Sequence, residues 1–261
     1  MSAQYDFSTI DIPEILRFVF HPRREWTPTP SDARDYLVPV EDGVGISCRF
    51  YPAGDDAPRV LYFHGNGEVA CDYDWIAPLY LRQGIALFVA DYRGYGKSDG
   101  NPSFASMLHD AQVIFHFFLD TMRPRSQKAP LFIMGRSLGT LSAVSIASQH
   151  AQDLKGLIVE SGTVRVAALL DLLGLPLAPE QTKGLEDAAR STLESITLPL
   201  LIIHGDSDTL IPPSEASFLF DHVGSEDKQL IAIPGAGHND IMMIGMEQYF
   251  AAIKEFVFRF R

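Results

Sequence analysis

From residue 59 onward, short apolar runs alternate with amphipathic stretches long enough to form a helix. Six of these runs are apolar at nearly every position, which is typical of strands buried between two layers of helices. Parallel strands need a crossover of about a dozen residues or more, and the stretches between the runs supply that length. The sequence therefore predicts a parallel sheet covered by helices on both faces. The predicted strands are Val60–Phe63, Ile85–Ala90, Leu131–Met134, Gly156–Val159, Leu200–Ile203 and Gln229–Ile233.

Two further apolar runs precede this alternation and extend the predicted sheet to eight strands. Tyr36–Val40 and Ile46–Tyr51 flank the turn residues Glu41, Asp42 and Gly43, a pattern typical of an antiparallel hairpin at a sheet edge. The predicted fold class is thus α/β, with a mostly parallel eight-stranded sheet. The expected helices are Val69–Arg82, Phe104–Met122, Leu138–His150, Ser214–Val223 and Asp240–Phe258.

The chain length of 261 residues fits one large α/β domain. We expect residues 1–35 to form a leader that packs on this domain, with a short amphipathic helix and then a connection broken by prolines. Residues 36–261 would form the domain itself. One connection, at about residues 162–198, is too long for a single helix and is rich in leucine. We interpret it as a small helical cap rather than an ordinary crossover with a decorated loop.

Composition and charge exclude several classes of partner. The formal net charge of -12 repels nucleic-acid phosphates, so nucleic acid is not an expected partner. No apolar run reaches transmembrane length, so we expect no integral membrane segment. Asp6, Asp11 and Glu14 stand where an export signal needs basic and then apolar residues, and Cys48 and Cys71 match no disulfide framework. We therefore expect a cytoplasmic protein in a reducing compartment.

Glycine-rich motifs follow the predicted strands at their carboxyl ends, where open parallel sheets place their ligands. One of them, Gly135 to Gly139, has the pattern G-x-S-x-G between a predicted strand and a predicted helix. This context is typical of a nucleophile elbow, a strained turn that raises a serine hydroxyl above the sheet edge and needs glycine-sized neighbours. Ser137 is therefore the candidate nucleophile.

A serine hydroxyl needs a base to accept its proton and an acid to orient that base. His238 follows the last predicted strand and is the candidate base. His64 and His204 also follow strands, but both precede tight loops where a histidine commonly hydrogen-bonds the backbone. For the acid we favour Asp208, and Asp206 and Glu160 stay open as alternatives.

The ordered set Ser137, Asp208 and His238, each after a different strand, resembles the α/β-hydrolase superfamily. Within that superfamily, His64-Gly65-Asn66, the loop from Asp91 to Gly96 and the elbow are similar to the Bem46 and ABHD13/ABHD17-type serine hydrolases. The resemblance covers about residues 36–258. It implies that Ser137 is the nucleophile, Asp208 the acid and His238 the base.

The resemblance also implies an oxyanion hole built from backbone N–H groups. Leu138 would supply one donor, and Asn66 the other, with the direction of the backbone mattering more than the side chain. We interpret Asp91 and Arg93 as a brace for the neighbouring loop rather than a substrate clamp. Glu68, in the first turn of a predicted helix, would merely stabilise that helix.

These residues predict a serine hydrolase that cleaves a small-molecule acyl ester or thioester through an acyl-enzyme. No cofactor is implied, and no carboxylate or histidine cluster has metal spacing. A peptidase, amidase or perhydrolase on the same scaffold is an alternative, because fold and triad define the reaction type better than the substrate. A non-catalytic binding module would not need nucleophile, base and acid together. The oligomeric state is not defined by the sequence.

Overall fold

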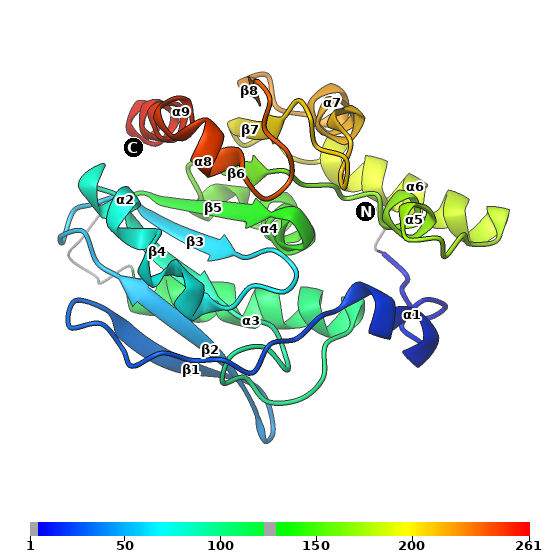
Figure 1. Cartoon of the computed structure of the whole chain (residues 1–261), viewed down its shortest axis with the longest axis horizontal. Helices are drawn as coiled ribbons and strands as arrows, with labels where there is room; N and C mark the ends of the chain where they lie inside the picture. Colours follow the sequence, from blue (N-terminus) through cyan, green and yellow to red (C-terminus); the bar gives the residue numbers. More distant parts are fainter. Residues whose placement is uncertain (1–4, 123–128) are drawn as a thin grey trace.

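A mostly parallel sheet forms the centre of the protein (Figure 1). The computed structural model describes residues 5–122 and 129–261, and within them the sheet has eight strands in the order β1-β2-β4-β3-β5-β6-β7-β8. β1 pairs with β2 and β2 with β4 in antiparallel fashion, and the other pairs are parallel. The predicted fold class and its edge hairpin are confirmed. The strands are β1 (Arg34–Glu41), β2 (Val44–Tyr51), β3 (Arg59–Phe63), β4 (Ala86–Ala90), β5 (Leu131–Arg136), β6 (Leu157–Glu160), β7 (Leu200–Gly205) and β8 (Lys228–Ile233).

Each face of the sheet has its own buried core, because successive side chains of a strand point to opposite faces. In β3, Leu61 and Phe63 join the core beneath α3 (Phe104–Met122) and α4 (Thr140–Gln149). Val60 and Tyr62 join the core beneath α2 (Ala77–Arg82) and α9 (Met246–Arg259). Two layers of helices therefore explain why these strands carry apolar residues on both faces.

Two predicted helices are each divided in the structure. The helix expected at 69–82 consists of the 3-10 turn η1 (Ala70–Asp74) and α2, with Pro78 in the first turn of α2, where a missing N–H is tolerated. The helix expected at 240–258 consists of α8 (Ile241–Ile244) and α9, separated by Gly245. A Cβ atom at Gly245 would lie 2.3 Å from the Ile233 side chain, so the chain turns against β8 at a point that only glycine allows.

Two helices, α5 (Val166–Leu172) and α6 (Pro179–Glu194), occupy the long connection between β6 and β7. They pack against each other, and α6 also contacts α4 and α7 (Pro213–His222). The description of residues 162–198 as a cap, and of residue 36 as the start of the domain, stays our interpretation.

In the leader, α1 (Pro13–Val19) lies at the carboxyl end of the sheet, and the segment after it runs back along β2 to β1 (Figure 1). The Asp11 carboxylate accepts the backbone N–H groups of Phe104 and Ala105 at 2.8 and 2.9 Å, at the start of α3. Residues 1–4 of the predicted leader lie outside the described residues. In the described ranges, no helix is both long and apolar enough to cross a bilayer.

Candidate active site

Ser137 lies in a tight turn between β5 and α4, with a φ of 50°. This left-handed conformation is rare for a residue with a side chain and costs on the order of 1–3 kcal/mol. The glycines on either side make the turn possible, because a Cβ atom at Gly135 would lie 2.5 Å from the Gly139 carbonyl oxygen. A Cβ atom at Gly139 would lie 2.1 Å from the Phe63 carbonyl oxygen on the neighbouring strand. The local geometry is that expected of a nucleophile elbow.

The three residues singled out from the sequence lie in one hydrogen-bonded row. His238 Nε2 is 2.9 Å from Ser137 Oγ, and His238 Nδ1 is 2.8 Å from Asp208 Oδ2. An ionised carboxylate only accepts hydrogen bonds, so we assign the imidazole proton to Nδ1 and leave Nε2 as the acceptor.

Asp208 is buried and held by three donors. Its Oδ1 accepts the backbone N–H groups of Leu210 and Ile211 at 2.9 and 2.8 Å, in addition to the bond from His238 to Oδ2. Burial alone would raise the pKa of Asp208, but the hydrogen bonds from His238 and the Ile211 backbone outweigh it and hold this pKa below its ordinary value. The carboxylate therefore stays ionised beside the imidazole.

The alternative acids have other partners. Asp206 Oδ1 accepts the Gly235 backbone N–H at 2.7 Å and the Ser207 hydroxyl at 2.9 Å. Glu160 accepts the Tyr249 hydroxyl at 2.6 Å and the Arg136 Nε–H at 3.2 Å. The geometry therefore favours Asp208 as the partner of the imidazole.

The other strand-end histidines are bonded away from Ser137. His64 Nε2 is 3.1 Å from Asp91 Oδ1, and the same carboxyl oxygen accepts the Ala70 backbone N–H at 2.7 Å. Asp91 thus holds the loop after β3 in place, as the bracing interpretation predicts. His204 Nε2 is 2.8 Å from the Ile211 carbonyl oxygen.

The Asn66 backbone N–H has no hydrogen-bond partner within residues 5–122 and 129–261, and Asn66, Leu138 and Ser137 line one pocket. The Asn66 side chain, to which the sequence reasoning gave no role, holds the leader. Its Oδ1 accepts the His21 backbone N–H at 3.0 Å and the Tyr95 hydroxyl at 2.7 Å, and its Nδ2 donates to the Val19 carbonyl oxygen.

Arg136 is a residue that the sequence reasoning missed. It occupies the variable position before Ser137, is buried, and pairs with Glu68 and Glu160. The interpretation of Glu68 as a helix-stabilising acid is wrong. Glu68 precedes the 3-10 turn η1, but its carboxylate pairs with this guanidinium and accepts the Gly65 N–H and the Tyr73 hydroxyl. An arginine at the end of a strand that is otherwise apolar was the available signal, because a buried cation requires a buried anion.

The pocket beside Ser137 has a volume of about 240 Å³. Its walls come from the leader, the elbow, α5 and the loop after β7, and they are mostly apolar. The apolar lining residues are Phe18, Val19, Leu138, Leu141, Val166, Leu169, Leu173, Leu210 and Ile211.

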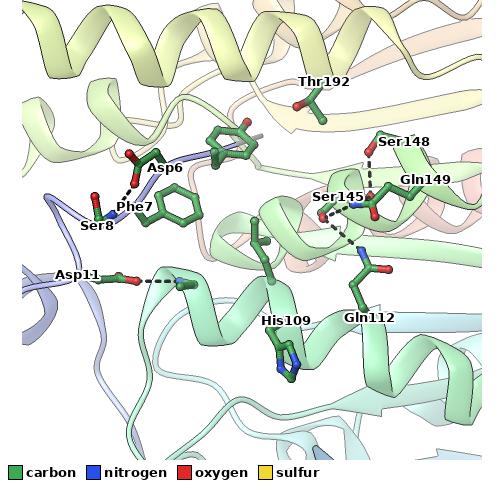
Figure 2. Close-up of a pocket in the computed structure, with 13 residues that line it drawn as sticks. Asp6, Phe7, Ser8, Asp11, His109, Gln112, Ser145, Ser148, Gln149 and Thr192 are labelled. Carbon is green, nitrogen blue, oxygen red and sulfur yellow. Dashed lines mark hydrogen bonds between the residues drawn. The ribbon is translucent and has the colours of Figure 1, made fainter. Parts of the chain in front are cut away.

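A larger hollow of about 740 Å³ lies between the leader, α3 and α4, away from Ser137 and His238. Figure 2 shows Gln112 and Gln149 pointing toward Ser145 in its polar wall. Its size does not make it the reaction site, because it contains no candidate nucleophile with an adjacent base. Across the described residues, no three His, Cys, Asp or Glu side chains are grouped to hold a metal ion.

Comparison with known proteins identifies the family. The profile described as Hydrolase_4, serine aminopeptidase S33, matches residues 55–182 and 177–242. The chain belongs to the serine aminopeptidase S33 family. This S33-family protein is therefore an α/β hydrolase, as the strand-end motifs predicted.

Named relatives of this S33-family protein agree with the resemblance found in its motifs. Alpha/beta hydrolase domain-containing protein 17B of Xenopus tropicalis is 30% identical over 233 residues, covering 85% of this chain and 74% of the relative. Protein bem46 of Schizosaccharomyces pombe is 26% identical over 208 residues, covering 78% and 68%. The Pyrococcus furiosus esterase Pf2001 superposes with a TM-score of 0.74 at 21% identity, covering 92% of this chain and 98% of that chain, which establishes a shared fold.

Proposed function

We propose that this S33-family hydrolase cleaves carboxylic esters or thioesters of small apolar acyl groups through an acyl-enzyme on Ser137. The observation that carries the proposal is the row of hydrogen bonds from Asp208 through His238 to Ser137, at the edge of an apolar pocket. A serine that is strained, partly exposed and bonded to an oriented imidazole has the geometry that acyl transfer requires.

In the first half of the reaction, Ser137 Oγ attacks the acyl carbonyl carbon while His238 Nε2 takes the hydroxyl proton. The carbonyl oxygen becomes an oxyanion, which the backbone N–H groups of Leu138 and Asn66 stabilise. As the bond to the leaving group breaks, the imidazolium gives its proton to the departing alkoxide or thiolate. The Nδ1 proton stays on the His238 ring throughout and is donated to the Asp208 carboxylate, which stabilises the positive ring.

In the second half, water attacks the acyl-enzyme and His238 takes the proton of the water. The second oxyanion collapses, the acid product leaves, and Ser137 recovers its proton from His238. The two halves use the same three side chains because the leaving group and the water occupy the same side of the carbonyl.

The pocket supports a small acyl group as the part of the substrate that it holds. A volume of about 240 Å³ lies below the range of about 300–1,000 Å³ that pockets for drug-sized ligands have. No aspartate or glutamate lines this pocket in the described part of the chain, and its charged side chain is that of Arg136. A peptide amino terminus would need a carboxylate partner there, so the lining favours an uncharged acyl ester over an aminopeptidase substrate.

The first experiment is covalent labelling with a fluorophosphonate probe. We expect the wild-type protein to be labelled and Ser137→Ala to lose labelling, because the probe reacts with an activated serine hydroxyl. Ser207→Ala is the control, since Ser207 is an exposed serine near the same edge of the sheet whose hydroxyl bonds Asp206. Labelling that persists in Ser137→Ala would contradict the mechanism. Faster turnover of an aminoacyl anilide than of a p-nitrophenyl acyl ester would contradict the substrate class.

A further inference from the structure

Arg136 lies where the elbow, the loop after β3, the end of β6 and the loop after β8 meet. It is the last residue of β5 and is followed directly by Ser137, and its side chain is almost fully buried. Extended backbone angles at Arg136, φ -106° and ψ 131°, precede the left-handed turn at Ser137, where φ is 50°. Any movement of the Arg136 side chain therefore acts on the backbone directly before the candidate nucleophile.

Each nitrogen of the guanidinium contacts a different part of the chain. Nε donates to Glu160 Oε1 at 3.2 Å, on β6, and Nη1 donates to Glu68 Oε1 in the loop after β3. Nη2 donates to the carbonyl oxygen of His238 at 3.0 Å and to Asn239 Oδ1 at 2.9 Å. The contact with the His238 carbonyl holds the backbone of the same residue whose ring bonds Ser137.

The contact with Glu68 extends to the loop that carries Asn66. Glu68 Oε2, the other carboxylate oxygen, accepts the Gly65 backbone N–H at 2.9 Å and the Tyr73 hydroxyl at 2.8 Å. Gly65 directly precedes Asn66, the proposed oxyanion donor. The path from Arg136 through Glu68 to Gly65 therefore links the elbow to the oxyanion loop by two hydrogen bonds.

Stability alone does not account for this arrangement. One cation faces two carboxylates, the buried Glu160 and the half-buried Glu68. Burial raises the pKa of Glu160 although Arg136 opposes it. Burial also acts to raise the pKa of Glu68, but the Arg136 charge outweighs it and lowers that pKa. Buried ion pairs often stabilise a fold no better than apolar packing of the same volume, because removing charges from water is costly.

We infer that Arg136 is a positioning residue that fastens the base loop and the oxyanion loop to the nucleophile elbow. The inference rests on the proposed hydrolysis at Ser137. A forked guanidinium can hold acceptors on three sides at once, whereas a lysine ammonium is a single point of charge on a flexible stem. Charge alone would therefore not replace Arg136.

The experiment compares Arg136→Lys with Arg49→Lys on a p-nitrophenyl acyl ester. Arg49 is the matched control, because its side chain is fully buried, bonds Asp35 at 2.7 Å and Asp74 at 2.9 Å, and lies outside the pocket. In Arg136→Lys we expect kcat to fall by about 10- to 100-fold with KM nearly unchanged, the scale of a catalytic group displaced by about 1 Å. In Arg49→Lys we expect a lower unfolding midpoint and an unchanged kcat.

A second variant and a spectroscopic measurement separate positioning from general damage. Asn239→Ala removes one exposed acceptor of Nη2, and we expect its kcat to fall by up to about 10-fold with an unchanged unfolding midpoint. The low-field proton resonance of the His238 Nδ1–H should shift or broaden in both variants, and this signal needs no substrate. If Arg136→Lys does not fold, the kcat and the proton resonance of Asn239→Ala test the inference instead.

Wild-type kcat and an unchanged resonance in Asn239→Ala, and in Arg136→Lys where it folds, would overturn the inference. In that case the wild-type protein would still be labelled by the fluorophosphonate. Absence of wild-type labelling would instead overturn the proposed function. The two failures are therefore distinguishable.

Discussion

Among the individual residues of the site, Asp208 has the most specific task. It accepts two backbone N–H groups through one oxygen and the His238 imidazole through the other, so its position is set before substrate binds. Its pKa lies below the ordinary value because these donors outweigh the effect of burial. An ionised acid in this position holds the imidazole in the tautomer that can accept the serine proton.

We expect Asp208→Asn to lower kcat for ester hydrolysis by about 10³- to 10⁴-fold, because an asparagine amide can present its N–H to the ring and stabilise the wrong tautomer. Asp206→Asn is the matched control, since Asp206 bonds Ser207 and Gly235 rather than the imidazole. We expect it to keep most of the activity. Steady-state kinetics on a p-nitrophenyl ester measure both. If Asp206→Asn were as inactive as Asp208→Asn, the assignment of Asp208 as the acid of the triad would be contradicted.

The candidate triad residues could be found from the sequence, but their surroundings could not. Ser137 and His238 are marked by residue type, by their glycine-rich loops and by their order after predicted strands. For Arg136 the sequence shows only a charged residue after an apolar run. Its role depends on the register of β5 against β6, which places it opposite Glu160. The role of the Asn66 side chain depends on where the leader passes the loop after β3, which no local sequence pattern specifies.

The presence of the helices could be predicted from the sequence, but the residues at which they begin, break and end could not. The helix expected at 69–82 is interrupted before Pro78, and the helix expected at 240–258 is interrupted at Gly245. Both interruptions follow from residues visible in the sequence. For Gly245, however, the decisive fact is the close approach of Ile233, a contact between elements that the sequence alone does not specify. Periodicity thus indicates that a helix exists, and packing decides where it breaks.

The leader forms part of the pocket wall, since Phe18, Val19 and His21 line it. The Asn66 side chain fastens this segment to the oxyanion loop through the Val19 carbonyl oxygen and the His21 N–H. Other contacts also hold the leader, including the ion pair of Arg23 with Asp72 at 2.6 Å. Loss of the Asn66 side chain should therefore loosen the wall without releasing the whole segment.

We expect Asn66→Ala to widen the acyl preference while keeping the backbone N–H of that residue. The ratio of kcat/KM for a longer acyl ester to that for the acetyl ester should rise by about 10-fold, the scale of one methylene in an apolar pocket. A ladder of p-nitrophenyl esters of increasing chain length measures this ratio. Asn101→Ala, at an exposed asparagine outside the pocket, should leave it unchanged. An unchanged ratio of kcat/KM values in Asn66→Ala would mean that the leader does not limit the length of the acyl group.

For the molecule as a whole, several carboxylates with shifted pKa values connect folding stability to pH. Burial would raise the pKa of Asp208, Glu68 and Asp35, but their donors and arginine partners outweigh it and hold all three below ordinary values. At acidic pH the unfolded chain therefore binds more protons at these positions than the folded chain does. Glu160 acts in the opposite direction, because burial raises its pKa.

The sign of the pH dependence follows from this balance. The stability contributed by the three lowered carboxyl groups is present above their unfolded pKa of about 4 and is lost as the pH falls through their folded values. We expect the free energy of unfolding, measured by urea denaturation, to decrease steadily from pH 5 toward pH 2. Asp208→Asn should show a shallower decrease than the wild type, whereas Asp42→Asn, at the exposed turn between β1 and β2, should run parallel to it. A wild-type curve that is flat between pH 5 and pH 3 would show that these ionised carboxylates contribute nothing to the stability of the fold.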